Sequence, residues 1–204
     1  MTNHARQLAL VTGAASGIGY ELARCCALHG FDLVVAADNP DTHRAAGSFR
    51  QLGINADALH VDLGTSEGVD LLLAQTDGQP IEVLIANAGL GLTRPFMVQS
   101  FTDIQRVIET NVTGTLRLIQ RVARPGPQNA VYNGTKAFID SFSHTLREEL
   151  HQDGITVTYL KPTPAMAGFA WQAEVGDAAV ARACFKALME GEAEIVIGLA
   201  GEVS

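Results

Sequence analysis

The chain has 204 residues, of which 47% are hydrophobic, and this size and composition are typical of one folded globular domain rather than a disordered segment. The formal net charge is -8 and no basic run is present, which argues against binding to nucleic acid or to an anionic membrane. No apolar run reaches the ~18 residues of a membrane span, and Met1 to Gln7 lack the apolar segment of a signal peptide. We therefore expect a cytoplasmic protein.

The three cysteines and six histidines show no disulfide or metal-binding pattern. Cys25 and Cys26 are adjacent, Cys184 is remote, and no C-x-x-C spacing occurs. No pair of histidines has metal-ligand spacing beside a carboxylate. We expect no metal site and assign the cysteines to packing.

A glycine-rich turn stands between an apolar run and a helical pattern. The apolar residues Leu8 to Val11 precede Thr12 to Gly19, which read T-G-A-A-S-G-I-G. A strand, a glycine turn and a helix in this order are the context of a dinucleotide phosphate site, although an ordinary strand-to-helix turn is the alternative. Gly13 permits a sharp turn, Gly17 a close approach to pyrophosphate, and Gly19 packing of the helix on the strand. The free N–H groups at the helix start would face the phosphates.

Strand-like apolar runs and helical patterns alternate along the chain. Further strands are predicted over Leu33–Ala37, Ala56–Val61, Val83–Ala86, Ile155–Lys161 and Ile195–Ile197. Further helices are predicted over Asp41–Leu52, Ser66–Gln75, Phe101–Ala123, Val131–Gln152 and Asp177–Met189. Several strands are apolar without alternation, as in a parallel sheet covered on both faces. The β-α repeat predicts a Rossmann-like, doubly wound parallel α/β sheet in a single domain spanning residues 1–204.

Polar residues follow three of the predicted strands. Asp38 ends the second strand and Asp62 ends the third, while Asn87-Ala88-Gly89 follows the next.

Two predicted helices also carry polar residues that need a reason. Asn111 interrupts the apolar stripe of the long helix, although asparagine is a poor helix former. Tyr132 and Lys136 are four residues apart near the start of the next helix, which places both side chains on one face.

Taken in this order, the motifs resemble those of the short-chain dehydrogenase/reductase family over nearly the whole chain. The matching motifs are T-G-x-x-x-G-x-G at 12–19, Asp62, Asn87-Ala88-Gly89, Asn111 and Tyr132-x-x-x-Lys136. The resemblance implies an NAD(P)-dependent oxidoreductase that transfers a hydride between nicotinamide and a carbonyl or secondary alcohol. It also implies a homodimer or homotetramer, since the helices with Asn111 and Tyr132 resemble the family's main subunit interface.

The resemblance assigns a role to each matching residue. Tyr132 would be the general acid/base, and the charge of Lys136 would favour the phenolate of a group that ordinarily ionises near pH ~10. In the family this lysine also binds the nicotinamide ribose, and Asn111 would hold a water for proton relay. The implied cofactor-binding residues are Gly13, Ser16, Gly17, Ile18, Gly19, Asp38, Asp62, Asn87, Ala88, Gly89, Tyr132 and Lys136.

The residues around the end of the second strand favour NAD over NADP. An acid there usually binds the ribose hydroxyls and rejects a 2′-phosphate. Ala37 holds the usual selecting position and Asp38 follows it, while Ser16 stands where NADP-preferring relatives often carry a basic residue. A carboxylate with no cation nearby disfavours the extra phosphate. We therefore expect NAD as the cofactor, with NADP possible through Arg44.

The chain departs from the family at the catalytic serine and at a central strand. The position of the serine falls at Leu118 to Gln120, and no serine occurs between Ser100 and Ser141. The Pro/Gly-rich segment from Ala123 to Val131 is too short for the strand and both its loops. The predicted sheet therefore lacks one central strand, and unpaired buried backbone groups are costly.

Two explanations of these departures stay open. In the favoured one, residues are omitted from this sequence, with interruptions between about Val122 and Gln128 and between Thr163 and Gly176, and the complete protein is an active reductase because Tyr132 and Lys136 remain. In the other, the chain is a catalytically inactive dinucleotide-binding relative that acts as a sensor or partner subunit. An isomerase or dehydratase of the related extended group is a weaker third, because that group usually has T-G-x-x-G-x-x-G spacing.

Overall fold

The computed structural model describes residues 6–122, 130–153, 155, 157–162, 186–187, 190–192 and 194–197. The chain divides into two compact units. The first holds residues up to 94 and 98–125, and the second holds residues 95–97 and those from 126 onward. We describe each unit in its own frame.

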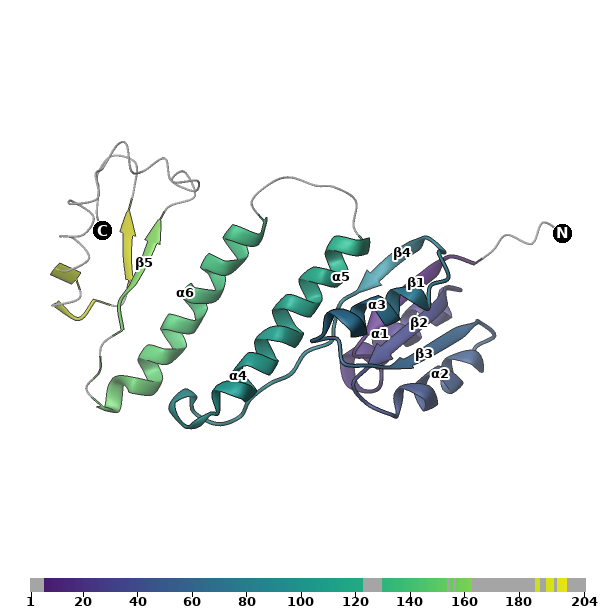
Figure 1. The fold of residues 1–204 in the computed structure, drawn as a ribbon, viewed down its shortest axis with the longest axis horizontal. Helices are drawn as coiled ribbons and strands as arrows, with labels where there is room; N and C mark the ends of the chain where they lie inside the picture. Colours follow the sequence, from purple (N-terminus) through teal and green to yellow (C-terminus); the bar gives the residue numbers. More distant parts are fainter. Residues whose placement is uncertain are drawn as a thin grey trace. The chain divides into compact units, whose positions relative to one another are not determined.

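The first unit is built on a parallel sheet of four strands in the order β3-β2-β1-β4 (Figure 1). The strands are β1 (Leu8–Thr12), β2 (Asp32–Ala37), β3 (Ala56–His60) and β4 (Ile81–Ile85). The helices between them are α1 (Gly17–Leu28), α2 (Thr42–Arg50) and α3 (Ser66–Ala74). This β-α alternation confirms the predicted Rossmann-like fold.

The side chains of the sheet alternate between two faces and form two cores. On one face Val11 packs in a cluster with Phe49 of α2 and residues of α1. On the other face Leu10 packs in a cluster with Leu72 of α3. All five residues of β1 are buried, which explains why its sequence is apolar without alternation. The sheet is therefore doubly wound, as predicted.

The long helix predicted over Phe101–Ala123 is interrupted by a π-helical segment. The elements α4 (Phe101–Ile108), η2 (Glu109–Gly114) and α5 (Thr115–Val122) follow one another directly and form one long rod (Figure 1). A π turn accommodates one extra residue and often marks a functional site. At Gly114 a Cβ would overlap the carbonyl oxygen of Leu63, so the glycine lets this rod close onto the loop after β3.

The second unit contains the helix α6 (Ala130–Leu150) and a separate parallel pair, β5 (Tyr159–Pro162) and β6 (Glu194–Ile197). The strand predicted over Ile155–Lys161 begins later than expected, at Tyr159. Tyr159 lies opposite Glu194, the first residue of β6, in the parallel pair.

Arg147 ties α6 to the segments beside this pair. Its guanidinium donates to the carbonyl oxygen of Val157 at 2.9 Å and to that of Gly191 at 2.7 Å. At the other side of the helix, the N–H of Phe96 donates to Glu149 at 2.6 Å, and the Phe96 ring meets the edge of Phe142 at 5.2 Å between centroids. These contacts hold the described parts of the second unit together.

The described residues contain no strand between β4 and β5 in the sequence. Within the described sheet β4 is an edge strand, and its residues are half-buried or exposed, unlike those of β1. The described sheet of the first unit therefore has no strand beyond β4. The interruptions predicted near 122–128 and 163–176 fall on residues 123–129 and 163–185, which lie outside the described residues, as does most of the helix predicted over Asp177–Met189.

Replacing Leu72 by alanine should destabilise the first unit. Leu72 is 0% exposed, whereas its neighbour on α3, Leu71, is 58% exposed. We expect Leu72→Ala to lower the free energy of unfolding by about 2–5 kcal/mol, because it leaves a cavity in the core. Leu71→Ala, the matched control, should change it by no more than ~0.5 kcal/mol. Urea unfolding followed by circular dichroism measures both, and equal effects would contradict the assigned core.

Candidate functional site

A cleft of about 200 Å³ opens in the first unit at the carboxyl ends of its parallel strands. The glycine turn, the ends of β2 and β3, the loop after β4 and the π-helical segment all contribute to its wall. The lining residues are Gly13, Ala15, Ser16, Ala37, Asp38, Asn39, Val61, Asp62, Leu63, Ala88, Gly89, Leu90 and Thr110. Ligands of open parallel sheets bind in this crevice outside the carboxyl ends of the strands.

The glycine turn has a backbone that requires glycine. Gly13 and Gly17 have φ angles of 68° and 59°, in the left-handed region. A Cβ on Gly13 would lie 2.8 Å from Nδ2 of Asn87, and a Cβ on Gly19 would overlap the carbonyl oxygen of Gly13. A Cβ on Gly17 would meet no atom within 4 Å, so this glycine faces open space. These surroundings fit the turn, the ligand approach and the helix packing predicted for the three glycines.

The N-terminus of α1 follows this turn and is not capped by a side chain. Ser16 is the N-cap residue and lines the cleft, but its side chain makes no capping hydrogen bond. In α3, by contrast, the Thr65 side chain accepts a hydrogen bond from the N–H of Gly68. Ile18, in the first turn of α1, is largely exposed. The first N–H groups of α1 therefore keep their capacity for an anion, which the helix dipole also favours.

Thr12 joins the glycine turn to the loop after β4. Its buried hydroxyl, on a residue only 1% exposed, accepts hydrogen bonds from the N–H groups of Asn87 and Ala88 at 3.0 Å each. The same hydroxyl donates to the carbonyl oxygen of Ile85 at 3.4 Å. The amide of Asn87 donates in return to the carbonyl oxygen of Thr12 at 3.3 Å. These bonds hold the loop after β4 against the glycine turn.

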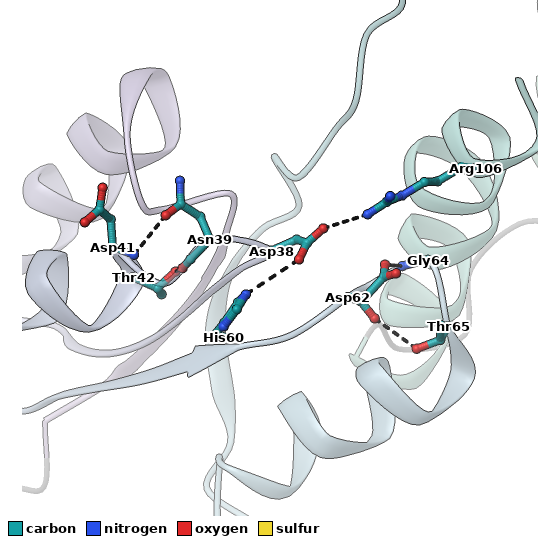
Figure 2. Close-up of polar contacts among 9 residues, drawn as sticks. All are labelled: Asp38, Asn39, Asp41, Thr42, His60, Asp62, Gly64, Thr65 and Arg106. Carbon is teal, nitrogen blue, oxygen red and sulfur yellow. Dashed lines mark hydrogen bonds and ion pairs between the residues drawn. The ribbon is translucent and has the colours of Figure 1, made fainter. Parts of the chain in front are cut away.

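Asp62 is fixed at the rim of the cleft by the loop that follows β3 (Figure 2). Its Oδ1 accepts a hydrogen bond from the N–H of Gly64 at 2.8 Å. The hydroxyl of Thr65 donates to its backbone carbonyl oxygen at 3.0 Å. The loop thus orients the carboxylate before any ligand arrives.

Asp38 is paired with two basic side chains (Figure 2). Its Oδ2 lies 2.9 Å from Nη2 of Arg106, on α4, and its Oδ1 lies 3.6 Å from Nε2 of His60, at the end of β3. The expectation that no cation lies near Asp38 is therefore wrong. Arg44, the cation singled out from the sequence, pairs instead with Asp41 at 3.3 Å, and its hydrogen bond to this carboxylate raises the pKa of the guanidinium.

Asn111 lies in the π-helical segment, and its side chain binds the backbone of Leu90. Its Oδ1 accepts from the N–H of Leu90 at 2.7 Å, and its Nδ2 donates to the carbonyl oxygen of Leu90 at 2.8 Å. These two hydrogen bonds supply the reason for an asparagine inside the helix, since they attach the rod to the loop after β4. The role of Asn111 in holding a water stays a prediction.

Tyr132 and Lys136 lie four residues apart on α6 of the second unit, and Lys136 is exposed. The spacing puts the two positions on one face of the helix. The other predicted site residues belong to the first unit, so the catalytic roles of this pair stay predictions. At the position expected for the family's serine, the structure has α5, with Leu118 buried in a core.

Sequence reasoning missed Arg106, and it gave no role to Thr12, which it had named as the first residue of the glycine motif. Arg106 is 68 residues from Asp38, and no local pattern joins the two. Thr12 did leave a signal, because it is a polar residue that ends an otherwise apolar, fully buried strand.

Two kinds of feature are absent from the described residues. They contain no group of three or more His, Cys, Asp or Glu side chains placed to hold a metal ion. None of their helices has both the length and the apolar character that crossing a membrane requires.

The chain is similar to known proteins of one family. A family model described as short chain dehydrogenase matches residues 7–125. The very-long-chain 3-oxoacyl-CoA reductase of Coprinopsis cinerea is 33% identical over 175 residues, which cover 73% of this chain and 52% of that protein. The serine 3-dehydrogenase of Agrobacterium fabrum is 31% identical over 175 residues, covering 75% of this chain and 70% of that protein.

A solved structure shares the fold and the family. L-sorbose reductase from Gluconobacter frateurii, complexed with NADPH and L-sorbose, is 25% identical with a TM-score of 0.55, covering 93% of this chain and 85% of that one. This chain spans about half the length of the first curated relative and 70% of the second. Because the family model covers more than half of the chain and the relatives are reductases and dehydrogenases, the chain belongs to the short-chain dehydrogenase/reductase family of NAD(P)-dependent oxidoreductases.

Proposed function

We propose that the complete protein is an active oxidoreductase that transfers a hydride between a nicotinamide cofactor and a carbonyl or secondary alcohol, and that residues 1–204 act as one cytoplasmic domain. One observation supports this above all. An uncapped helix N-terminus and a glycine turn face a cleft whose rim carries the carboxylates of Asp38 and Asp62. The relatives act on an oxoacyl-CoA, on serine and on sorbose, so the common chemistry is oxidation of an alcohol or reduction of a carbonyl.

The residues of the cleft fit a dinucleotide. The backbone N–H groups at the start of α1, with Ser16 and Ile18, would hold the pyrophosphate where Gly17 leaves open space. Asp38 would accept a hydrogen bond from a ribose hydroxyl, and Asp62, oriented by its own loop, would accept one from the adenine. The Asn87-Ala88-Gly89 loop would form the floor, held by the Thr12 hydroxyl. The bound nicotinamide supplies the hydride chemistry.

Three residues of this chain would move the proton. Tyr132 would donate a proton to the substrate oxygen in reduction and accept it in oxidation. The positive charge of Lys136 would favour the phenolate, and its ammonium would bind the nicotinamide ribose. Asn111 uses its amide to hold Leu90, but an amide oxygen has a second lone pair and the nitrogen a second proton, so a water can still bind there.

A specific observation favours a second candidate, a catalytically inactive dinucleotide-binding relative that acts as a sensor or partner subunit. The described sheet ends at β4, no serine occurs between Ser100 and Ser141, and Leu118 is buried where the serine was expected. Such a protein would bind cofactor without turnover. Steady-state assays of the complete purified protein with a panel of ketones and secondary alcohols separate the two candidates.

The cleft should bind NADH more tightly than NADPH. The reason is the carboxylate of Asp38, which attracts a ribose hydroxyl and repels a 2′-phosphate. We expect a dissociation constant about tenfold lower for NADH, measured by titration of the fluorescence of the reduced cofactor. Equal or tighter binding of NADPH would show that the preference is assigned wrongly.

In an active protein, Tyr132→Phe should remove nearly all turnover and leave NADH binding unchanged. The loss should be about 10²–10⁴-fold in kcat, because the phenyl ring cannot transfer a proton. Lys136→Ala should weaken both turnover and binding, whereas Lys186→Ala, at an exposed lysine of the same unit paired with Glu190, serves as the control without effect. Substantial activity in Tyr132→Phe would reject this acid/base assignment.

We also propose a homodimer or homotetramer related by two-fold axes. The helices that carry Asn111 and Tyr132 would form the interface. Light scattering at micromolar concentration should give two or four times the chain mass of 21.6 kDa. A mass of one chain across this range would argue against the assembly.

A further inference from the structure

We propose that Arg106 is a latent ligand for the 2′-phosphate of NADP(H), held by Asp38, and that this ion pair sets the cofactor preference of the cleft. The inference rests on the proposed function, because it assumes that the cleft takes a dinucleotide. It names a residue on α4, outside the glycine turn and the end of β2, as the determinant of cofactor choice.

The geometry places a cation beside the carboxylate that the ribose would meet. Asp38 lines the cleft, and its Oδ2 accepts a hydrogen bond from Nη2 of Arg106 at 2.9 Å. Figure 2 shows the guanidinium of Arg106 extended from its helix toward Asp38. The pair belongs wholly to the first unit, and its side chains are 47% and 57% exposed. An exposed ion pair contributes little to the free energy of folding, so an anion that binds the guanidinium more strongly can displace Asp38 from it.

A phosphate monoester is that stronger anion. The guanidinium presents a planar fork of N–H donors that matches a phosphate, and the 2′-phosphate carries more charge than one carboxylate. While Asp38 holds Arg106, the Nη2 group is bonded to the carboxylate, and the carboxylate repels the phosphate. Removal of the Asp38 charge therefore acts twice, since it ends the repulsion and releases the guanidinium.

Two other basic side chains, His60 and Arg44, must be compared with Arg106 as ligands for the 2′-phosphate. His60 faces the other carboxylate oxygen at 3.6 Å and carries charge only when protonated. Arg44 is already paired at 3.3 Å with Asp41, the N-cap residue of its helix α2. Arg106 is thus the side chain that is always positively charged and bonds directly to the Asp38 carboxylate. Arg44 is the other candidate ligand for the 2′-phosphate, and a test must distinguish it from Arg106.

The test is a double-mutant cycle on cofactor binding. Dissociation constants for NADPH and NADH are measured by fluorescence for the unmodified protein, Asp38→Asn, Arg106→Gln and the double variant. We expect Asp38→Asn to tighten NADPH binding about tenfold or more and the double variant to lose most of that gain. NADH binding should change less than about threefold between Asp38→Asn and the double variant, and added salt should reduce the NADPH gain.

Two arginine variants serve as controls in the Asp38→Asn background. Arg121→Gln removes a matched exposed pair, because Arg121 lies 3.0 Å from Asp70 with side chains 58% and 59% exposed, and it should leave the NADPH gain intact. Arg44→Gln should also leave it intact. Circular dichroism spectra that match the unmodified protein show that each variant is folded.

The outcomes separate this inference from the proposed function. If Asp38→Asn still tightens NADPH binding when Arg106 is replaced, or if the tightening depends on Arg44, the inference is wrong. Binding of NADH by the same variants would then still support the cofactor site. No NADPH gain in Asp38→Asn would overturn it as well. Failure of the unmodified protein to bind either cofactor would overturn the proposed function itself.

Discussion

The cleft depends on the hydrogen bonds of one buried hydroxyl. Thr12 ends β1, and its Oγ1 accepts from two N–H groups of the loop after β4 while donating to the carbonyl oxygen of Ile85. A threonine hydroxyl has one proton and two lone pairs, so this arrangement uses its full capacity. An apolar residue here would leave the N–H groups of Asn87 and Ala88 without this acceptor, and unsatisfied buried donors are costly. The glycine turn can face an ordered loop because this hydroxyl connects them.

The charge of Asp38 at the rim of the cleft is partly neutralised by ion pairs that form only in the tertiary structure. Asp38 stands next to Arg106 of α4 and His60 of β3, and the three residues come from three different elements. A carboxylate that is partly neutralised repels an incoming phosphate less than an isolated one. The preference of such a cleft for one cofactor is therefore a property of the pair and not of the acid alone, which is why Asp38 and Arg106 need to be considered together.

The described strands are divided between the two units of the chain. In the described sheet β4 is an edge with half-buried residues, and β5 pairs with β6 in a separate unit. Arg147 stabilises that unit by donating to carbonyl oxygens of two segments next to the strand pair. The family model also ends at residue 125, before Tyr132. The lining residues of the cleft thus all belong to the first unit, whereas the proposed acid/base pair lies on a helix of the other.

The sequence alone determined the features that depend on neighbouring residues. The apolar run of β1, the three glycines and the spacing of Tyr132 and Lys136 predicted the fold class, the phosphate turn and the family, because strand burial and turn geometry act over a few residues. The short segment from Ala123 to Val131 also predicted that one central strand is missing, and this segment lies almost wholly outside the described residues. Only the tertiary structure decided the surroundings of Asp38, which had been expected to lack a cation, and the reason for Asn111, which binds Leu90. These contacts join residues 68 and 21 positions apart, and no periodicity or spacing in a single chain encodes a contact over such a distance.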